Sequence, residues 1–326
     1  MQIYCKVTRG NHVESQHLIY AVAVNEGGKI IFSTGDPDYQ TCIRSSLKPF
    51  QAAASVHAGA VKSSGFTDEE LALMCASHNG EEIHVKTAKS MMNKLGFSKD
   101  HYECGIHAPY DKESKIALLH KKKDYSPFDN NCSGKHAGML ALAKHLGVKP
   151  AGYTNCDHPV QKTIFDLLRI YSGQNEIVTA IDGCSAPTLF MSLHGIALLF
   201  QKLASGQYPE LEEVYQAMAH HPYLVAGRNR FDTDFIKVMT GKAITKVGGE
   251  AVRGVAFRNK NGETFGLALK VLDGNQRANP VATMAVLDHL KFIEEEDLAG
   301  LKDYRNPKLF NLRKIQTGNI SAHFEN

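Results

Sequence analysis

A serine and a lysine lie three residues apart in the stretch "RSSLKPFQ", residues 44–51, and this spacing suits nucleophilic catalysis. Positions i and i+3 share a face of a helix, so a helix here would bring the Ser45 hydroxyl beside the Lys48 amine. A serine hydroxyl is a weak nucleophile at neutral pH and needs a neighbouring base, which a neutral lysine can supply. Ser46 is the alternative nucleophile, but Pro49 stands where its lysine would be needed. The spacing therefore favours Ser45, with Ser46 as hydrogen-bonding support.

Two later motifs strengthen this interpretation: "SHN" at residues 77–79 and "KVG" at residues 246–248. The order S-x-x-K, S-x-N, K-x-G is the signature of serine β-lactamases and penicillin-binding proteins. In this scheme the charge of Lys246 favours a neutral Lys48, and Ser77 passes a proton to the leaving amine. Asn79 orients the substrate or Lys48, and the backbone N–H of Ser45 binds the developing oxyanion. The predicted reaction is acyl transfer through a covalent acyl-enzyme that water then hydrolyses.

Two residues beside these motifs have open roles. Arg44 precedes the predicted nucleophile, and it either places the substrate or is a structural surface arginine. His78, inside "CASHNGE", is a candidate site residue because of its position between Ser77 and Asn79.

Two cysteine motifs, "NNCSGKHAGM" (130–139) and "DGCSAPT" (182–188), carry possible metal ligands. Cys132, Lys135 and His136 would share a helix face, and Cys184 could meet them in the fold. Two thiolates and a nitrogen donor suit zinc. Buried structural thiols are the alternative interpretation.

Composition restricts the class of protein. The 326-residue chain has 43% hydrophobic and 22% charged residues, as expected of a globular protein with a sizeable core. A formal net charge of +3 gives no nucleic-acid footprint, and we expect no membrane segment. The seven scattered cysteines and an N-terminus without an apolar signal region favour a cytoplasmic protein with free thiols.

The predicted helices and strands that carry these residues follow a simple order along the chain. Strand patterns occur near both ends of the chain, and helical patterns fill the middle, which predicts an α+β fold with one antiparallel sheet and a helical insertion. The sheet region is expected at about 1–45 and 240–326, and the helical region at about 46–239. Expected elements are a hairpin at 17–34, helices at 45–60, 67–78, 81–95, 136–147, 158–173, 188–206, 209–222 and 279–295, loops at 97–131, and strands at 243–247, 251–259 and 263–274.

Taken together, the motifs resemble the rhizobial-type L-asparaginases of the asparaginase II family. The resemblance runs along the chain and rests on "RGNHVESQH", "RSSLKPFQA", "CASHNGE", "NCSGKHAGML", "DGCSAPT", "KVGGE" and "GLALKVLDGNQRA". It implies a single domain over residues 1–326 with a serine β-lactamase-like fold, a homodimer, and hydrolysis of L-asparagine to L-aspartate and ammonia. One departure is Ala251, which stands where the family pattern leads us to expect a glycine.

The resemblance also implies two Ser–Lys pairs and a zinc ion held by two cysteines and a lysine. Ser45 pairs with Lys48, and Ser77 pairs with Lys246 or, as the alternative, Lys270. The zinc ligands would be Cys132, Lys135 and Cys184, with Asp182 and His136 orienting the metal-bound water. The predicted assignments are catalysis by Ser45, Lys48, Ser77 and Lys246, substrate binding by Arg44, Ser46, His78, Asn79, Gly80, Glu81 and Asp182, and zinc binding by Cys132, Lys135 and Cys184.

Several alternatives stay open at this level. Glutamine is one methylene longer than asparagine, a difference worth only about 1–3 kcal/mol in a pocket. A penicillin-recognising enzyme and a zinc-stabilised protein that binds asparagine without hydrolysing it are further hypotheses. The zinc could serve catalysis or structure.

Overall fold

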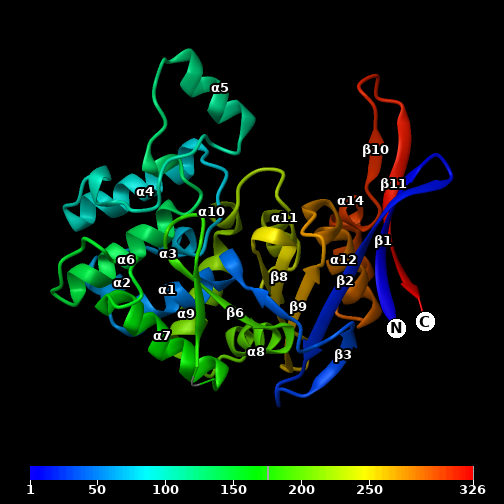
Figure 1. Ribbon diagram of the computed structural model, residues 1–326, viewed down its shortest axis with the longest axis horizontal. Coiled ribbons are helices and arrows are strands. Elements are labelled where there is room, and N and C mark those ends of the chain that lie inside the picture. Colours follow the sequence, from blue (N-terminus) through cyan, green and yellow to red (C-terminus); the bar gives the residue numbers. More distant parts are fainter. Residues whose placement is uncertain (175, 326) are drawn as a thin grey trace. The chain divides into compact units, whose positions relative to one another are not determined.

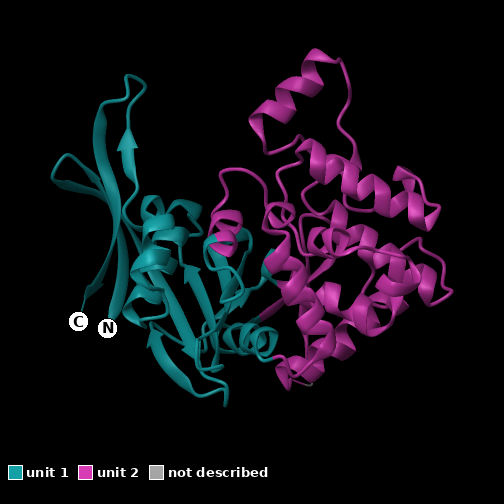
Figure 2. Cartoon of the chain, turned by 180° about the vertical axis from the view of Figure 1, so that it is seen from behind, with its two compact units in different colours: residues 1–46, 191–205, 238–326 teal, residues 47–190, 206–237 magenta. Residues whose placement is uncertain are grey.

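The computed structural model describes residues 1–174 and 176–325, and the chain forms two compact units. Unit 1 comprises residues 1–46, 191–205 and 238–326 (Figures 1 and 2). Unit 2 comprises residues 47–190 and 206–237.

Unit 1 is built on an eight-stranded sheet in the order β10-β11-β1-β2-β9-β8-β7, with β3 paired to β2. Neighbouring strands run antiparallel, and the sheet joins N-terminal to C-terminal strands. This confirms the predicted α+β sheet architecture. The strands are β1 (Gln2–Arg9), β2 (His12–Val24), β3 (Ile30–Thr34), β7 (Ala243–Val247), β8 (Val252–Arg258), β9 (Thr264–Val271), β10 (Lys308–Phe310) and β11 (Gln316–Glu325), and a short β4 (Gln40–Cys42) also belongs to this unit.

Two helices cover opposite faces of this sheet. Helix α8 (Leu193–Ala204) packs so closely that a Cβ at Gly254 of β8 would lie 1.9 Å from the Phe200 ring. The next residue back, Arg253, instead donates to the side chain of Asn279 in α12 (Asn279–His289). Since successive residues of a strand point to opposite faces, the central strands are buried on both sides. Short helices α13 (Glu295–Gly300) and α14 (Lys302–Arg305) follow α12.

Unit 2 is mainly helical. Helix α6 (Ser133–His145) lies at its centre and is buried from Ser133 to Ala143. A Cβ at Gly134 would lie 2.2 Å from the Leu73 carbonyl oxygen, so this glycine lets α6 approach α3 closely. The other helices are α1 (Lys48–His57), α2 (Ala60–Ser63), α3 (Asp68–Met74), α4 (Glu82–Leu95), α5 (Lys112–His120), α7 (Pro159–Ser172), α9 (Pro209–His220), α10 (Pro222–Val225) and α11 (Phe231–Val238), and strand β5 (Val178–Ile181) pairs with the first part of β6 (Pro187–Ser192).

Several sequence predictions differ from the structure. Residues 97–131 contain helix α5, whose weak amphipathic pattern and exposed side chains gave little periodic signal. The apolar run 188–206 is a strand followed by a helix, because Ser192 caps α8 by accepting from the Gly195 N–H. The last long helix ends at His289, and the β10–β11 hairpin that follows was not predicted.

No helix within the described residues combines the length and apolar character required to cross a bilayer.

Candidate active site

Ser45 lies in unit 1 on a 3₁₀ turn, Arg44–Leu47, rather than at the start of the α-helix. Helix α1 begins only at Lys48, three residues later than the sequence predicted. Arg44 has φ 51°, a left-handed conformation that is strained for a residue with a side chain. Ser45 is half-buried, and within the described part of unit 1 its hydroxyl has no hydrogen-bond partner. The hydroxyl of the predicted nucleophile is therefore not required for hydrogen bonding within the described part of unit 1.

The end of strand β7 packs against this turn. The Ser46 hydroxyl donates to the Lys246 carbonyl oxygen at 2.9 Å, and both residues are fully buried. A Cβ at Gly248 would lie 2.7 Å from the Ile43 carbonyl oxygen, so only glycine allows this approach. The structure thus brings the serine turn and the Lys246 segment together within unit 1, as the order of the sequence motifs anticipates.

The two lysines proposed as partners of Ser77 also lie in unit 1. The Lys246 amine donates to the Val247 carbonyl oxygen at 2.8 Å, whereas the Lys270 amine donates to the Glu250 carbonyl oxygen. Burial lowers the pKa of Lys270. Ser77 belongs to unit 2, so its pairing with either lysine stays a prediction.

Ala251, the unexpected residue of "KVGGEAV", has φ 55°. This left-handed conformation costs a residue with a Cβ roughly 1–2 kcal/mol and costs glycine little. The glycine expected from the family pattern therefore has a physical reason at this position.

In unit 2, Lys48 and Ser77 are in direct contact. The Lys48 amine donates to the Ser77 hydroxyl at 3.0 Å and to the Ala76 carbonyl oxygen at 2.5 Å, and a longer contact of 3.5 Å reaches the Asn131 carbonyl oxygen. Lys48 is 1% exposed and Ser77 is 6% exposed. A buried amine held against a serine hydroxyl is suited to moving a proton to or from that oxygen.

The segment that carries Ser77 is held on both sides. The backbone N–H groups of Ser77 and Asn79 donate to the carbonyl oxygens of Val225 and Ala226. The intervening His78 faces the interior, where its Nε2 atom lies 2.9 Å from the Ser133 hydroxyl. Burial, followed by neighbouring His84 and Lys48, holds the pKa of His78 well below its usual value.

Gly80 continues this segment with φ 76°, and its backbone N–H donates to Nδ1 of His78 at 3.0 Å. A Cβ there would lie 3.0 Å from Pro109. Both ring nitrogens of His78 are thus hydrogen-bonded inside unit 2.

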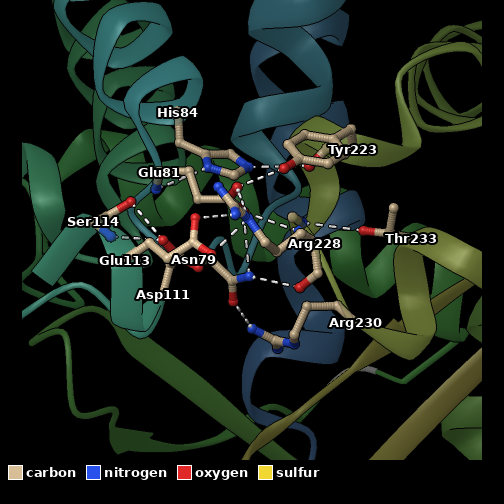
Figure 3. Close-up of polar contacts among 11 residues, drawn as sticks. Asn79, Glu81, His84, Asp111, Glu113, Ser114, Tyr223, Arg228, Arg230 and Thr233 are labelled. Atoms are coloured by element: carbon tan, nitrogen blue, oxygen red, sulfur yellow. Dashed lines mark hydrogen bonds and ion pairs between the residues drawn. The ribbon is translucent and has the colours of Figure 1, made fainter. Parts of the chain in front are cut away.

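Glu81 is the centre of a polar network that Figure 3 shows. Its carboxylate accepts from the Tyr223 hydroxyl at 2.5 Å, from the backbone N–H and Nε of Arg228 at 2.9 Å each, and from Asn79 at 3.3 Å. Although burial opposes ionisation, these hydrogen bonds outweigh it and lower the pKa of Glu81 to about 2. Glu81 is therefore a buried, permanently charged acid at neutral pH.

The sequence motifs do not include Tyr223, Arg228 or Arg230, which the structure places around Glu81 and Asn79. All three come from the stretch "YLVAGRNRF", which has no chemical motif. The pair of arginines that follow Gly227 is a weak sequence signal that this stretch contributes to a binding site. The φ of this glycine is 109°, and a Cβ there would lie 2.3 Å from the Glu81 carboxylate.

The predicted zinc ligands also come together in unit 2. The Lys135 amine donates to Sγ of Cys184 at 2.9 Å, and all three side chains, Cys132, Lys135 and Cys184, are buried at 4% exposure. A hydrogen bond from Cys132 and the charge of Lys135 lower the pKa of Cys184 despite its burial. Burial opposes the charged form of Lys135, but the sulfur charges outweigh it and raise its pKa.

His136 and Asp182 surround this cluster. His136 is fully buried, its Nδ1 atom lies 2.7 Å from the Tyr153 hydroxyl, and its ring also interacts with Cys184. Asp182 is close enough for its charge to raise the pKa of Lys135. Within residues 1–174 and 176–325, no group of three or more His, Cys, Asp or Glu side chains is arranged to hold a metal ion.

The donors nevertheless fit zinc in their chemistry. Two sulfur atoms and an amine lie in one buried cluster, and the fully buried imidazole of His136 lies beside them. The structure thus groups the predicted site residues in two sets: Arg44, Ser45, Ser46 and Lys246 in unit 1, and Lys48, Ser77, His78, Asn79, Gly80, Glu81, Cys132, Lys135, Asp182 and Cys184 in unit 2.

Comparisons with known proteins give a family and a series of similar solved structures. No sequence among curated proteins matches this chain. Native Mglu is 12% identical, with 86% of this chain and 66% of that protein covered and a TM-score of 0.37. Mglu in its glutamate form is also 12% identical, with 84% and 61% covered and a TM-score of 0.36. The TLA-1 extended-spectrum β-lactamase is 11% identical, with 88% and 92% covered and a TM-score of 0.39.

The chain therefore spans just under two thirds of the length of these two Mglu structures. At such low identities and TM-scores, the similarity gives no information about the activity of this chain. The model of the L-asparaginase II family, in contrast, matches residues 5–322. This match confirms the family predicted from the motifs and supports an amidohydrolase. The chain belongs to the L-asparaginase II family.

Proposed function

We propose that this protein hydrolyses L-asparagine to L-aspartate and ammonia by serine–lysine catalysis. The observation that carries the proposal is the buried contact of 3.0 Å between the Lys48 amine and the Ser77 hydroxyl, in a chain of the L-asparaginase II family. The motif order places Ser45 close in sequence to Lys48, and the Ser45 hydroxyl is uncommitted within unit 1.

In the proposed reaction the Ser45 oxygen attacks the carbon of the side-chain amide, and its proton passes to a lysine amine. The tetrahedral intermediate expels ammonia, which receives a proton through Ser77. A water molecule then attacks the ester carbon, its proton returns to the base, and the Ser45 hydroxyl is restored as aspartate leaves. The roles of Lys48 and Ser77 are supported by their direct contact, and the role of Lys246 by its position beside the serine turn.

Zinc is part of the same proposal. Cys132, Lys135 and Cys184 would hold the ion, and Asp182 and His136 would surround it. A bound zinc ion supplies a Lewis acid or, through a bound water, a polarised oxygen, and it can also act as a purely structural link.

We expect purified protein to contain about one zinc ion per chain and to lose thermal stability when a chelator removes it, because a ligand that binds only the folded state stabilises it. Cys184→Ala should abolish zinc binding. Cys156→Ala is the matched control, since this cysteine is exposed and should retain the metal. Metal analysis by mass spectrometry and thermal unfolding check this prediction. If both variants contained one zinc ion, the metal would bind elsewhere in the protein. If neither the variants nor wild type contained zinc, the protein would not be a zinc protein.

A cytoplasmic location and a homodimeric assembly complete the proposal. The seven cysteines are free thiols in the structure, which suits a reducing compartment. Fractionation of cells and the mass of the purified protein in solution test these two points.

The function is tested by ammonia release from purified protein with L-asparagine and L-glutamine in parallel, with and without added zinc. Release from asparagine at a higher kcat/KM than from glutamine is the expected result. A preference for glutamine would make the protein a glutaminase with the same serine chemistry. Binding of asparagine without ammonia release would replace the enzyme by a non-catalytic binding protein, and covalent labelling by a fluorescent penicillin would favour a penicillin-recognising enzyme.

A further inference from the structure

Both polar atoms of the Asn79 side-chain amide form hydrogen bonds with other residues of the protein. Its nitrogen donates to the Arg228 carbonyl oxygen at 3.0 Å and to the Glu81 carboxylate at 3.3 Å. Its oxygen accepts from the Arg230 guanidinium at 2.7 Å. Since Asn79 is only 5% exposed, it serves as a fixed support that holds Arg230 in place.

The two arginines beside Asn79 have opposite charge environments. Arg228 forms ion pairs with Glu81 at 2.9 Å, with Asp111 at 3.6 Å and with Glu113. Arg230 pairs with no carboxylate in the part of the chain that the structure describes, and its contact with Asn79 uses a neutral acceptor. Figure 3 shows the Arg230 guanidinium at the Asn79 oxygen, apart from the acids around Arg228. A guanidinium has five N–H donors, so Arg230 retains N–H donors and has no direct counter-ion among the described residues.

Arg230 also lies near the Lys48–Ser77 contact. Ser77 and Asn79 are two residues apart in a segment whose N–H groups both point to residues 225–226, as alternate residues of an extended chain do. After burial and the neighbouring His84, the charges of Lys48 and Arg230 contribute to the lowered pKa of His78. Both cations are therefore within electrostatic reach of the same buried imidazole.

The loop that carries Arg230 is held in one conformation. The Gly227 N–H donates to the Thr233 hydroxyl at 3.1 Å, and that hydroxyl donates to the Pro222 carbonyl oxygen at 3.2 Å. The Arg230 carbonyl oxygen accepts from the Asp234 N–H at 3.1 Å, which joins the loop to helix α11. Such a fixed loop lowers the entropy lost when the guanidinium binds a ligand.

We propose that Arg230 binds the carboxylate of the substrate and thereby selects amides that also carry a carboxylate. The inference rests on the proposed function, because asparagine has a carboxylate beside the amide that is hydrolysed. The planar fork of a guanidinium matches the two oxygens of a carboxylate, and a half-buried arginine without a counter-ion gains its missing partner when the substrate binds. Asn79 then acts through Arg230 as a positioning residue.

The experiment compares Arg230→Gln with wild type on three amides: L-asparagine, succinamate, which keeps the carboxylate but lacks the amino group, and 3-aminopropanamide, which lacks the carboxylate. Loss of a charge-assisted pair should lower kcat/KM for the two carboxylates on the order of 100-fold, mainly through KM, and leave 3-aminopropanamide unaffected. Arg230→Lys should recover part of the loss because it keeps the charge without the fork. Lys237→Gln is the control, since it removes one positive charge from an exposed position of α11.

Each outcome separates this inference from the proposed function. If wild type hydrolyses asparagine and Arg230→Gln lowers kcat/KM equally for all three amides, Arg230 is only structural and the inference fails while the asparaginase stands. If wild type hydrolyses none of the amides, the proposed function fails, and calorimetric titration of L-aspartate then decides the inference. Weaker aspartate binding by Arg230→Gln than by Lys237→Gln supports a carboxylate site, and equal binding overturns it.

Discussion

Replacing Ser45 by alanine is expected to lower ammonia release from L-asparagine by on the order of a thousandfold or more, because no other group would form the acyl-enzyme. The folded state should be almost unaffected. The Ser45 hydroxyl has no hydrogen-bond partner within the described part of unit 1, so its loss should change the free energy of unfolding by less than about 0.5 kcal/mol. Steady-state kinetics and urea unfolding of the same preparation measure both effects.

Ser46→Ala is the matched comparison, because it should reduce stability more than Ser45→Ala does and activity much less. Its hydroxyl is fully buried and donates to the Lys246 carbonyl oxygen, so its removal should cost about 1 kcal/mol or more of stability. Its effect on kcat should stay within about tenfold, as expected of a supporting residue. If Ser46→Ala abolished turnover and Ser45→Ala did not, the nucleophile would be Ser46.

Replacing Glu81 by glutamine is expected to remove a pH-dependent part of the stability. The pKa of Glu81 is about 2 in the folded protein, and that of an unfolded glutamate is about 4.3. Between these values the unfolded state binds more protons, so stability rises with pH. The contribution is complete above about pH 5 and is lost as pH falls from there toward 2, and the shift corresponds to on the order of 3 kcal/mol.

Wild type should therefore be more stable than Glu81→Gln at pH 7 by a few kcal/mol, and the difference should narrow below about pH 5. Urea unfolding at pH values from about 2.5 to 8 measures this difference. Glu113→Gln is the control: Glu113 also pairs with Arg228, but its side chain is 75% exposed against 4% for Glu81. Exposed pairs contribute at most about 1 kcal/mol, so this variant should differ little from wild type. Stability curves that run parallel for Glu81→Gln and wild type over the whole range would contradict the assigned pKa.

The architecture was largely predictable because its signals are local. The short run 243–247 with its β-branched residues and the cap at Thr67 are local signals, and the structure contains both β7 and the Thr67–Glu70 capping box. Helix α5 and the β10–β11 hairpin were missed because their exposed residues leave no clear apolar period. The 188–206 segment was assigned to one helix because a buried strand and a buried helix are equally apolar in sequence.

The amino-acid sequence is sufficient to identify the family and the kinds of side chain available for the chemistry. The motifs carry serines and lysines whose order is typical of acyl transfer, and the family match over residues 5–322 agrees with the predicted family. Zinc binding by the cysteines and Lys135 stays a prediction. Which of these side chains are in contact is apparent only in the folded chain. The contacts of Lys48 with Ser77, and of Lys135 with Cys184, join residues 29 and 49 positions apart.

Arg228 and Arg230 show most clearly that the pairing of charged side chains cannot be predicted from sequence alone. Arg228 and Arg230 are two residues apart in an unremarkable loop, yet three carboxylates pair with the first and none pairs with the second in the described chain. The charge of an arginine is fixed by its side chain, but whether that charge is balanced depends on which distant carboxylates the fold brings within a few ångströms. Pairing of this kind has no local signal, so the sequence supplies the charged groups and the fold decides which of them is left for a substrate.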